Sequence, residues 1–269
     1  MTIKFYAPHW GNTLPFASFC KNVKEAGYDG VEMHLPFEKK EKEDILAILK
    51  DYALEFIGQY WQSVEKGLAE HATNYERYLY HLIEAQPQFI NCQTGKDYYD
   101  FDQNKHLFDL AARVSKASGV KITHETHRGK SLFAAHITQH YLTQIPNLRL
   151  CLDISHWCNV HESLLTDQQE AVELAIAHTD HIHSRIGHPE GPQVNDPRAS
   201  EWKDIVGAHL NWWDKVVEMH QKNGTTLTVT TEFGPTPYMP TLPHTQIPVA
   251  HQWDINVFVM DLLKNRYQN

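Results

Sequence analysis

The chain has 269 residues, 42% of them hydrophobic and 21% charged, so it can bury a large core as one α/β barrel or as two small domains. Its formal net charge of −9 and the lack of a basic stripe argue against a nucleic-acid partner, because phosphate binding needs clustered lysine and arginine. No apolar run is long enough to span a bilayer, and the first residues lack the basic and apolar regions of a signal peptide. We therefore expect a soluble cytoplasmic protein without a membrane partner.

Short β-type runs alternate with amphipathic segments from one end of the chain to the other. The β-type runs predict strands at residues 3–7, 30–36, 55–61, 89–93, 120–125, 148–154, 181–185 and 226–234. Apolar residues at helical spacing predict helices that include residues 16–23, 45–52, 64–85, 107–114, 137–145, 168–177, 206–217 and 250–263. Eight strands that alternate with helices, without hairpin signals, imply parallel βα units.

The number of units and the chain length match a single (β/α)8 TIM barrel, with residues 1–269 as one domain. A doubly wound open sheet is the alternative, but it usually carries a glycine-rich phosphate turn after its first strand, and none is present. The four cysteines show no CxxC spacing and fall in or beside apolar segments, so we expect reduced core residues and no disulfide.

Ionisable residues stand at the C-terminal ends of the last four predicted strands: Glu125, Asp153, His183 and Glu232. In a barrel these ends form the mouth at which active sites lie. Three carboxylates and an imidazole in one place conflict electrostatically, and a divalent metal ion resolves that conflict. Oxygen-rich ligation with one nitrogen suits Mn²⁺, Mg²⁺ or Co²⁺, with Mn²⁺ preferred, although Zn²⁺ would also bind.

The motifs HETHRG, DISHW, HIHSRIG and TEFGP, in this order at these strand ends, resemble the xylose-isomerase-like TIM-barrel superfamily of sugar (phosphate) isomerases and epimerases. The resemblance implies one metal ion held by Glu125, Asp153, His183 and Glu232. It also implies that Glu125 and Glu232 transfer a proton on a small sugar substrate through a cis-enediolate. The D-x-x-H pattern makes His156 a contact to a substrate oxygen.

Three further residues are candidate substrate contacts. Arg185 lies two residues after His183 on the same face of its strand, and Glu32 and Trp10 lie near the ends of the first two strands. Glu32 would alternatively cap its strand, and Trp10 would alternatively belong to the core. Where 3-epimerases of the superfamily carry an acidic residue and an arginine, this chain has Lys130-Ser131 and His188-Pro189, so the sugar and the choice between isomerase and epimerase stay open.

Other functions remain compatible with the same fold. A dehydratase would use the same metal-assisted chemistry but lose water. An enzyme like endonuclease IV would need more metal ligands and a basic groove, which the acidic charge disfavours. A non-catalytic sugar-binding barrel would bind its ligand without proton exchange. A homo-oligomer is also compatible, because barrels of this size often pair and the long loops 186–200 and 235–248 suit lids or oligomer contacts.

Overall fold

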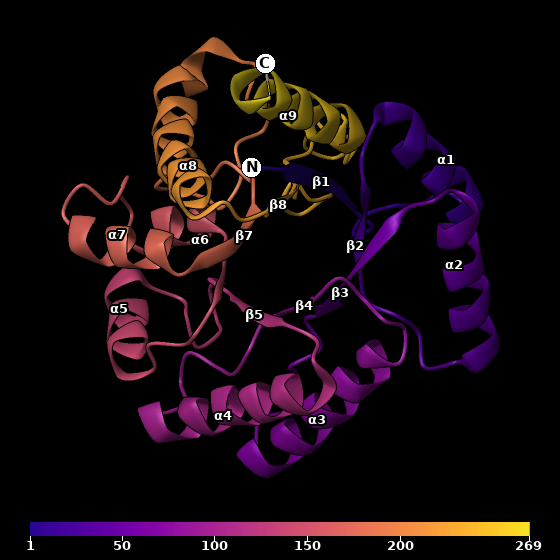
Figure 1. Ribbon diagram of the computed structural model, residues 1–269. Coiled ribbons are helices and arrows are strands. Elements are labelled where there is room, and N and C mark those ends of the chain that lie inside the picture. Colours follow the sequence, from indigo (N-terminus) through magenta and orange to yellow (C-terminus); the bar gives the residue numbers. More distant parts are fainter. Residues whose placement is uncertain (269) are drawn as a thin grey trace.

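The computed structural model describes residues 1–268, and its eight parallel strands close into a barrel in chain order (Figure 1). The strands are β1 Ile3–Pro8, β2 Gly30–Met33, β3 Glu55–Tyr60, β4 Ile90–Cys92, β5 Ile122–Glu125, β6 Leu150–Leu152, β7 Thr179–His183 and β8 Leu227–Thr230. The pairing of β1 with β8 closes the barrel, with Ile3 opposite Leu227. The prediction of a (β/α)8 TIM barrel is confirmed.

Helices surround the strands (Figure 1). They are α1 Phe16–Ala26, α2 Lys39–Asp51, α3 Leu68–Ile83, α4 Phe101–Ser118, α5 Ala135–Gln144, α6 Ile154–Val160, α7 Gln169–Ala177, α8 Lys203–Asn223 and α9 Gln252–Tyr267, with a 3-10 turn at Ser200–Trp202. Helix α1, for example, packs an apolar stripe of Phe19, Cys20 and Val23 onto the barrel. None of the helices within residues 1–268 is long and apolar enough to cross a membrane.

Three strands differ from their predicted bounds in a way that affects the site. The eighth is expected at 226–234 but occupies Leu227–Thr230, which leaves Glu232 on the loop that follows it. The sixth strand is expected to continue to residue 154, but β6 ends at Leu152 because Asp153 starts a helix: its Oδ1 accepts the backbone N–H of Ser155 at 3.1 Å. The resulting helix α6 is absent from the sequence prediction. The seventh strand is expected at 181–185 but occupies Thr179–His183, which leaves Arg185 on the loop that follows it.

At some positions the barrel leaves no space for a side chain beyond glycine. Gly30, the first residue of β2, is one of them, because a Cβ there would lie 2.3 Å from the carbonyl oxygen of Glu55 and 2.7 Å from the ring of Tyr6. All four cysteines are free and buried, as expected.

Candidate metal centre and cavity

Glu125, Asp153, His183 and Glu232 come from four neighbouring strands and meet inside the barrel mouth. Glu125 ends β5 and His183 ends β7, whereas Asp153 and Glu232 follow β6 and β8 by one and two residues. All four side chains are buried. One ligand atom from each lies within 4.8 Å of the other three, so the structure brings together all four residues that the strand ends indicate.

His183 is oriented by contacts on both of its ring nitrogens. Nδ1 lies 2.8 Å from Oε2 of Glu232 and 3.7 Å from Oε1 of Glu125, and Nε2 lies 3.1 Å from both oxygens of Glu32. Burial opposes the charged ring, but Cys151 and the carboxylates of Glu232 and Glu32 hold the pKa of His183 well above its ordinary value. The centre of the cluster therefore attracts positive charge.

Arg185 joins two of the carboxylates. Its Nη2 forms an ion pair with Oδ2 of Asp153 and donates a hydrogen bond to Oε2 of Glu232 at 2.8 Å. The guanidinium is 1% exposed and lies under the rings of Tyr238 and Trp10, 4.8 and 5.7 Å from their centroids. Burial opposes its charge, yet Asp153 and Glu232 raise the pKa of Arg185 above its ordinary value, so it stays charged.

The three carboxyl groups differ in their electrostatic environment. Burial, with the charges of neighbouring carboxylates, raises the pKa of Glu125 and that of Asp153. Burial also acts on Glu232, but there His183 and Arg185 outweigh it and lower the pKa. Two titratable groups with pKa values shifted apart are the arrangement that an acid/base pair needs.

The donor set fits a divalent cation. The carboxylates of Glu125, Asp153, Glu232 and the adjoining Glu32 carry four formal negative charges when ionised. Arg185 and the protonated His183 carry two positive charges, which leaves two negative charges to be balanced. The Nδ1 atom of His183 is buried without a hydrogen-bond partner, so a nitrogen ligand is available beside the carboxylate oxygens. Hard oxygen donors with one imidazole are the ligands that Mn²⁺, Mg²⁺ and Co²⁺ accept.

A second grouping of metal-ligand residue types, Cys151, His181 and His183, shares a residue with the first. Burial raises the pKa of the Cys151 thiol well above its ordinary value, so it stays protonated. Both imidazoles direct Nε2 at Glu32, at 3.1 Å. Both imidazole Nε2 atoms of this grouping are therefore engaged by Glu32.

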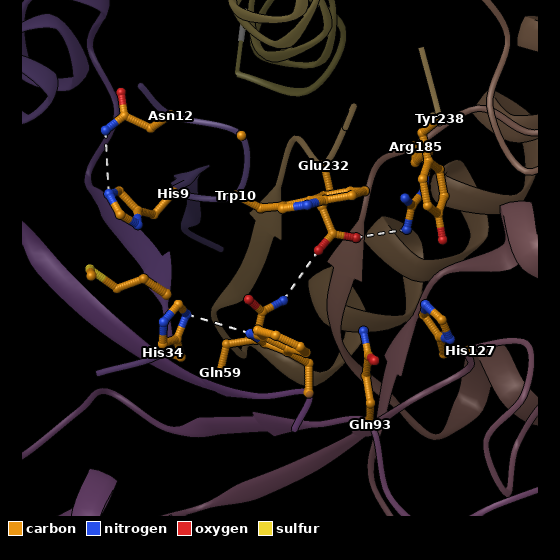
Figure 2. Close-up of a pocket in the computed structure, with 13 residues that line it drawn as sticks. His9, Trp10, Asn12, His34, Gln59, Gln93, His127, Arg185, Glu232 and Tyr238 are labelled. Carbon is orange, nitrogen blue, oxygen red and sulfur yellow. Dashed lines mark hydrogen bonds and ion pairs between the residues drawn. The ribbon is translucent and has the colours of Figure 1, made fainter. Parts of the chain in front are cut away.

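A cavity of about 390 Å³ adjoins the cluster, and Figure 2 shows the side chains that face it. Its wall consists of His9, Trp10, Gly11, Asn12, Met33, His34, Gln59, Trp61, Gln93, His127, Arg185, Glu232 and Tyr238. Trp10, a predicted substrate contact, lies across Gly234, where a Cβ would be 2.1 Å from its ring. Arg185, another predicted contact, also belongs to the wall.

The two other predicted substrate contacts, Glu32 and His156, are not among the residues of the described chain that line the cavity. Both are buried. His156 lies behind the cluster, with Nε2 3.2 Å from Nη2 of Arg185 and 3.5 Å from Oδ2 of Asp153. Glu32 is enclosed by the side chains of His183, His181, Asn91 and Thr230, all within hydrogen-bonding distance.

Two amides at the site are missed by the sequence analysis. Gln59 near the end of β3 donates to Oε1 of Glu232 at 3.2 Å, and Gln93 after β4 approaches Oε1 of Glu125 at 3.4 Å. Both lie at strand ends, so the rule that found the acidic residues would have found them. Tyr238 gives no such signal, because it stands in the loop after β8 and reaches the site only through the path of that loop.

The chain is similar to known proteins in structure. No protein-family model matches its sequence, and no curated protein matches it. Solved structures do. A sugar phosphate isomerase/epimerase from Parabacteroides distasonis ATCC 8503 superposes with a TM-score of 0.64 at 12% identity, over 97% of this chain and 93% of that chain. A 3-keto-D-glucoside 4-epimerase from E. coli gives 0.61 at 14% identity, over 98% and 100%.

A xylose isomerase domain containing protein from Salmonella typhimurium has the same fold, with a TM-score of 0.63 at 12% identity over 97% of this chain and 96% of that chain. Other solved structures with this fold include a probable 3-DHS dehydratase from Bacillus anthracis and an endonuclease IV from Thermus thermophilus. The resemblance indicated by the four motifs is thus confirmed at the level of the fold. Because the neighbours include different activities, function has to be argued from the site.

Proposed function

We propose that the chain is a divalent-metal-dependent isomerase or epimerase of a sugar, carried by a single barrel domain and acting by proton transfer through a cis-enediolate. The observation that carries the proposal is the convergence of Glu125, Asp153, His183 and Glu232 beside a cavity whose wall includes Glu232. The fold shared with sugar isomerases and epimerases supports the same class of reaction.

The four residues would hold one metal ion, preferably Mn²⁺. Such an ion supplies Lewis-acid stabilisation of negative charge on the carbonyl and hydroxyl oxygens of the substrate, which lowers the pKa of the adjacent C–H. Glu232 then serves as the base, because it faces the cavity and its pKa is lowered by His183 and Arg185 despite burial. Gln59, which donates to Glu232 at 3.2 Å, fixes the direction of that carboxylate.

Glu125 would be the partner that returns the proton. Its pKa is raised by burial and by nearby carboxylates, so its protonated form is favoured. A proton returned to the same carbon from the opposite face inverts that centre, whereas one returned to the neighbouring carbon moves the carbonyl. Glu125 lies behind Gln93, whose amide nitrogen is 3.4 Å from Oε1, so access for proton return depends on the position of that amide.

The cavity wall favours an uncharged substrate over a sugar phosphate. Among its described residues Arg185 is the one lysine or arginine, and two carboxylates already share it. Burial lowers the pKa of His9 to about 4 and that of His127 to about 3, so both rings are neutral near pH 7. A phosphate dianion would lose its hydration without gaining a free cation. The hydroxyl groups of a neutral sugar have suitable partners in the imidazoles and amides.

Lysines close to the site do not change this conclusion. Lys96 and Lys130, on the loops after β4 and β5, both bind Ser63 and do not line the cavity. Two tryptophans supply apolar surface instead: Trp10 is 36% exposed and Trp61 is 46% exposed, and both rings face the cavity. Such rings suit the C–H face of a sugar ring.

The test is a panel of aldoses and ketoses, each paired with its phosphate, incubated in D2O with the Mn²⁺-loaded protein. NMR after removal of the metal reports which carbon gains deuterium and which product forms. We expect deuterium at a carbon next to the carbonyl of an unphosphorylated sugar. Exchange with phosphates alone would refute the substrate class, and no exchange with any sugar would refute the enzyme.

The same panel separates the alternative functions. A dehydratase would release water and leave a new C=C or carbonyl group in the product, whereas an isomerase keeps the elemental composition. A sugar-binding barrel would show ligand-induced stabilisation without exchange. Endonuclease activity would need a groove of cationic residues, and neither the net charge of −9 nor the cavity wall provides one.

A further inference from the structure

Glu32, the third residue of β2, is a buried carboxylate that lies beside the metal ligands without being one of them. It is 1% exposed and stands within 3.1 Å of four hydrogen-bond donors. They are Nε2 of His183, Nε2 of His181, Nδ2 of Asn91 and Oγ1 of Thr230. An ionised carboxylate offers about four lone-pair sites, so these donors saturate it.

This saturation determines what Glu32 can do. No lone pair is left for a substrate hydroxyl or a metal ion, and Glu32 does not belong to the cavity wall within the described chain. An anion in such a position is nevertheless costly to bury, so its contacts have to be strong enough to retain it. Glu32 can therefore influence the site only by orienting the side chains that it contacts.

The contact with His183 fixes the proton on that ring. Nε2 of His183 lies 3.1 Å from both oxygens of Glu32, and a lone pair on Nε2 would repel them. Nε2 must therefore carry a hydrogen, and a ring that has given up its other proton to bind a metal ion keeps only that one N–H. In the metal-free protein Nδ1 forms an ion pair with Glu232 at 2.8 Å and lies 3.7 Å from Glu125, and its lone pair becomes the ligand when a metal ion takes the place of its proton.

His181 holds Glu32 from the other side. Its Nδ1 lies 3.0 Å from the carbonyl oxygen and 2.7 Å from the hydroxyl oxygen of Thr228, which holds the ring so that its Nε2 faces Glu32 at 3.1 Å. Thr230 adds a hydroxyl donor at 2.5 Å. Residues of β7 and β8 thus fix the position of the Glu32 carboxylate. The carboxylate in turn restrains the orientation of the His183 ring that contacts it.

We infer that Glu32 is a positioning residue, which sets the tautomer and ring angle of His183 so that Nδ1 is the metal-binding atom. The inference rests on the proposed metal centre and assigns Glu32 a role other than substrate contact. A carboxylate that accepts the second N–H of a metal-binding histidine typically contributes about 10- to 100-fold to metal affinity.

The experiment measures Mn²⁺ affinity of the metal-free protein by calorimetry, without substrate. Glu32→Gln is expected to weaken binding by about 10- to 100-fold. Thr230→Val removes one donor but keeps the contact between Glu32 and His183, so its affinity should stay much closer to the parent value. The matched control is Glu55→Gln, because Glu55 starts β3 at the opposite end of the barrel and pairs with Lys4 and Tyr6.

A second measurement keeps the inference testable if Glu32→Gln does not fold. Nitrogen-15 NMR of the Zn²⁺-loaded wild-type protein should show His183 with a proton on Nε2 and metal on Nδ1. Metal on Nε2, or equal affinities for wild type and Glu32→Gln, would overturn the role of Glu32. A Thr230→Val variant as weak as Glu32→Gln would also overturn it, because general packing would then explain both. A wild-type protein that binds no divalent ion would instead refute the metal centre itself.

Discussion

Arg185→Met removes the guanidinium that two buried carboxylates share. Asp153 is 0% and Glu232 is 3% exposed, so neither charge gains water when its partner is lost. Breaking one buried ion pair typically costs about 3–5 kcal/mol, because a charge is left uncompensated in the interior. Both pairs depend on one side chain, so their costs do not add. We expect the metal-free variant to lose about 3–5 kcal/mol of its free energy of unfolding.

Metal should restore part of that loss. A ligand at about 100 times its Kd stabilises the folded state by about 2.7 kcal/mol. Because Arg185 and a metal ion are attracted to the same carboxylates, removal of the guanidinium should tighten metal binding. Mn²⁺ should therefore stabilise the variant more than it stabilises the wild type.

The assay is urea unfolding of both proteins with and without Mn²⁺. Arg113→Met is the matched control, since Arg113 pairs with Glu76 at 3.5 Å but its side chain is 63% exposed, and an exposed pair contributes at most about 1 kcal/mol. A loss below about 1 kcal/mol for Arg185→Met, or a smaller Mn²⁺ effect than in the wild type, would refute the shared-cation description of the site.

Three further predictions concern catalysis, the cavity wall and acid stability. Glu232→Gln should abolish deuterium incorporation into the active sugar, while its circular dichroism spectrum stays unchanged. Glu125→Gln should still remove the substrate proton but form product slowly. Gly234→Ala pushes the ring of Trp10 aside, so KM should rise, with a stability loss of about 1–3 kcal/mol in urea unfolding. Stability should fall steeply in acid, since burial lowers the pKa of several histidines: His71 to about 4, His124 to about 3 and His209 to about 4.

The sign of the acid effect follows from proton counts. The histidine pKa is about 6.5 in the unfolded chain and lower in the folded protein. At pH values between these two, the unfolded chain binds more protons than the folded protein, so the free energy of unfolding decreases as the pH falls. Each such histidine contributes up to about 1.4 kcal/mol per pH unit. A urea midpoint that does not change between pH 7 and pH 5 would contradict the neutral, buried state of these rings.

The strands could be predicted because each combines β-type residues with a clear break after it. Helix α6 could not, because five consecutive residues, 154–158, are buried and therefore show no helical periodicity. Its signal was instead the capping carboxylate of Asp153, which the sequence analysis assigned to a strand end. The same residue thus serves as helix cap, ion-pair partner of Arg185 and candidate ligand.

The meeting of the four acidic and imidazole side chains was predictable for a topological reason. A barrel gathers the ends of its strands whatever sequence lies between them. The partners of each side chain were not predictable, because they come from other strands. Glu32 illustrates this: its donors stand on β4, β7 and β8, and no spacing in the sequence relates Asn91 or Thr230 to it.

Glu32 and Glu125 show why the number of donors matters more than the residue type. Both are glutamates, 1% exposed, at the same barrel mouth. Glu32 has donors within 3.1 Å at both oxygens, whereas the amides of Asn91 and Gln93 approach Glu125 only to 3.4 Å, beyond the usual hydrogen-bond range. The oxygens of Glu125 therefore keep their lone pairs and need a cation or a proton. A buried carboxylate in that condition has lone pairs left for a metal ion or a proton, whereas Glu32, whose lone pairs are all engaged, acts only through the groups that it binds.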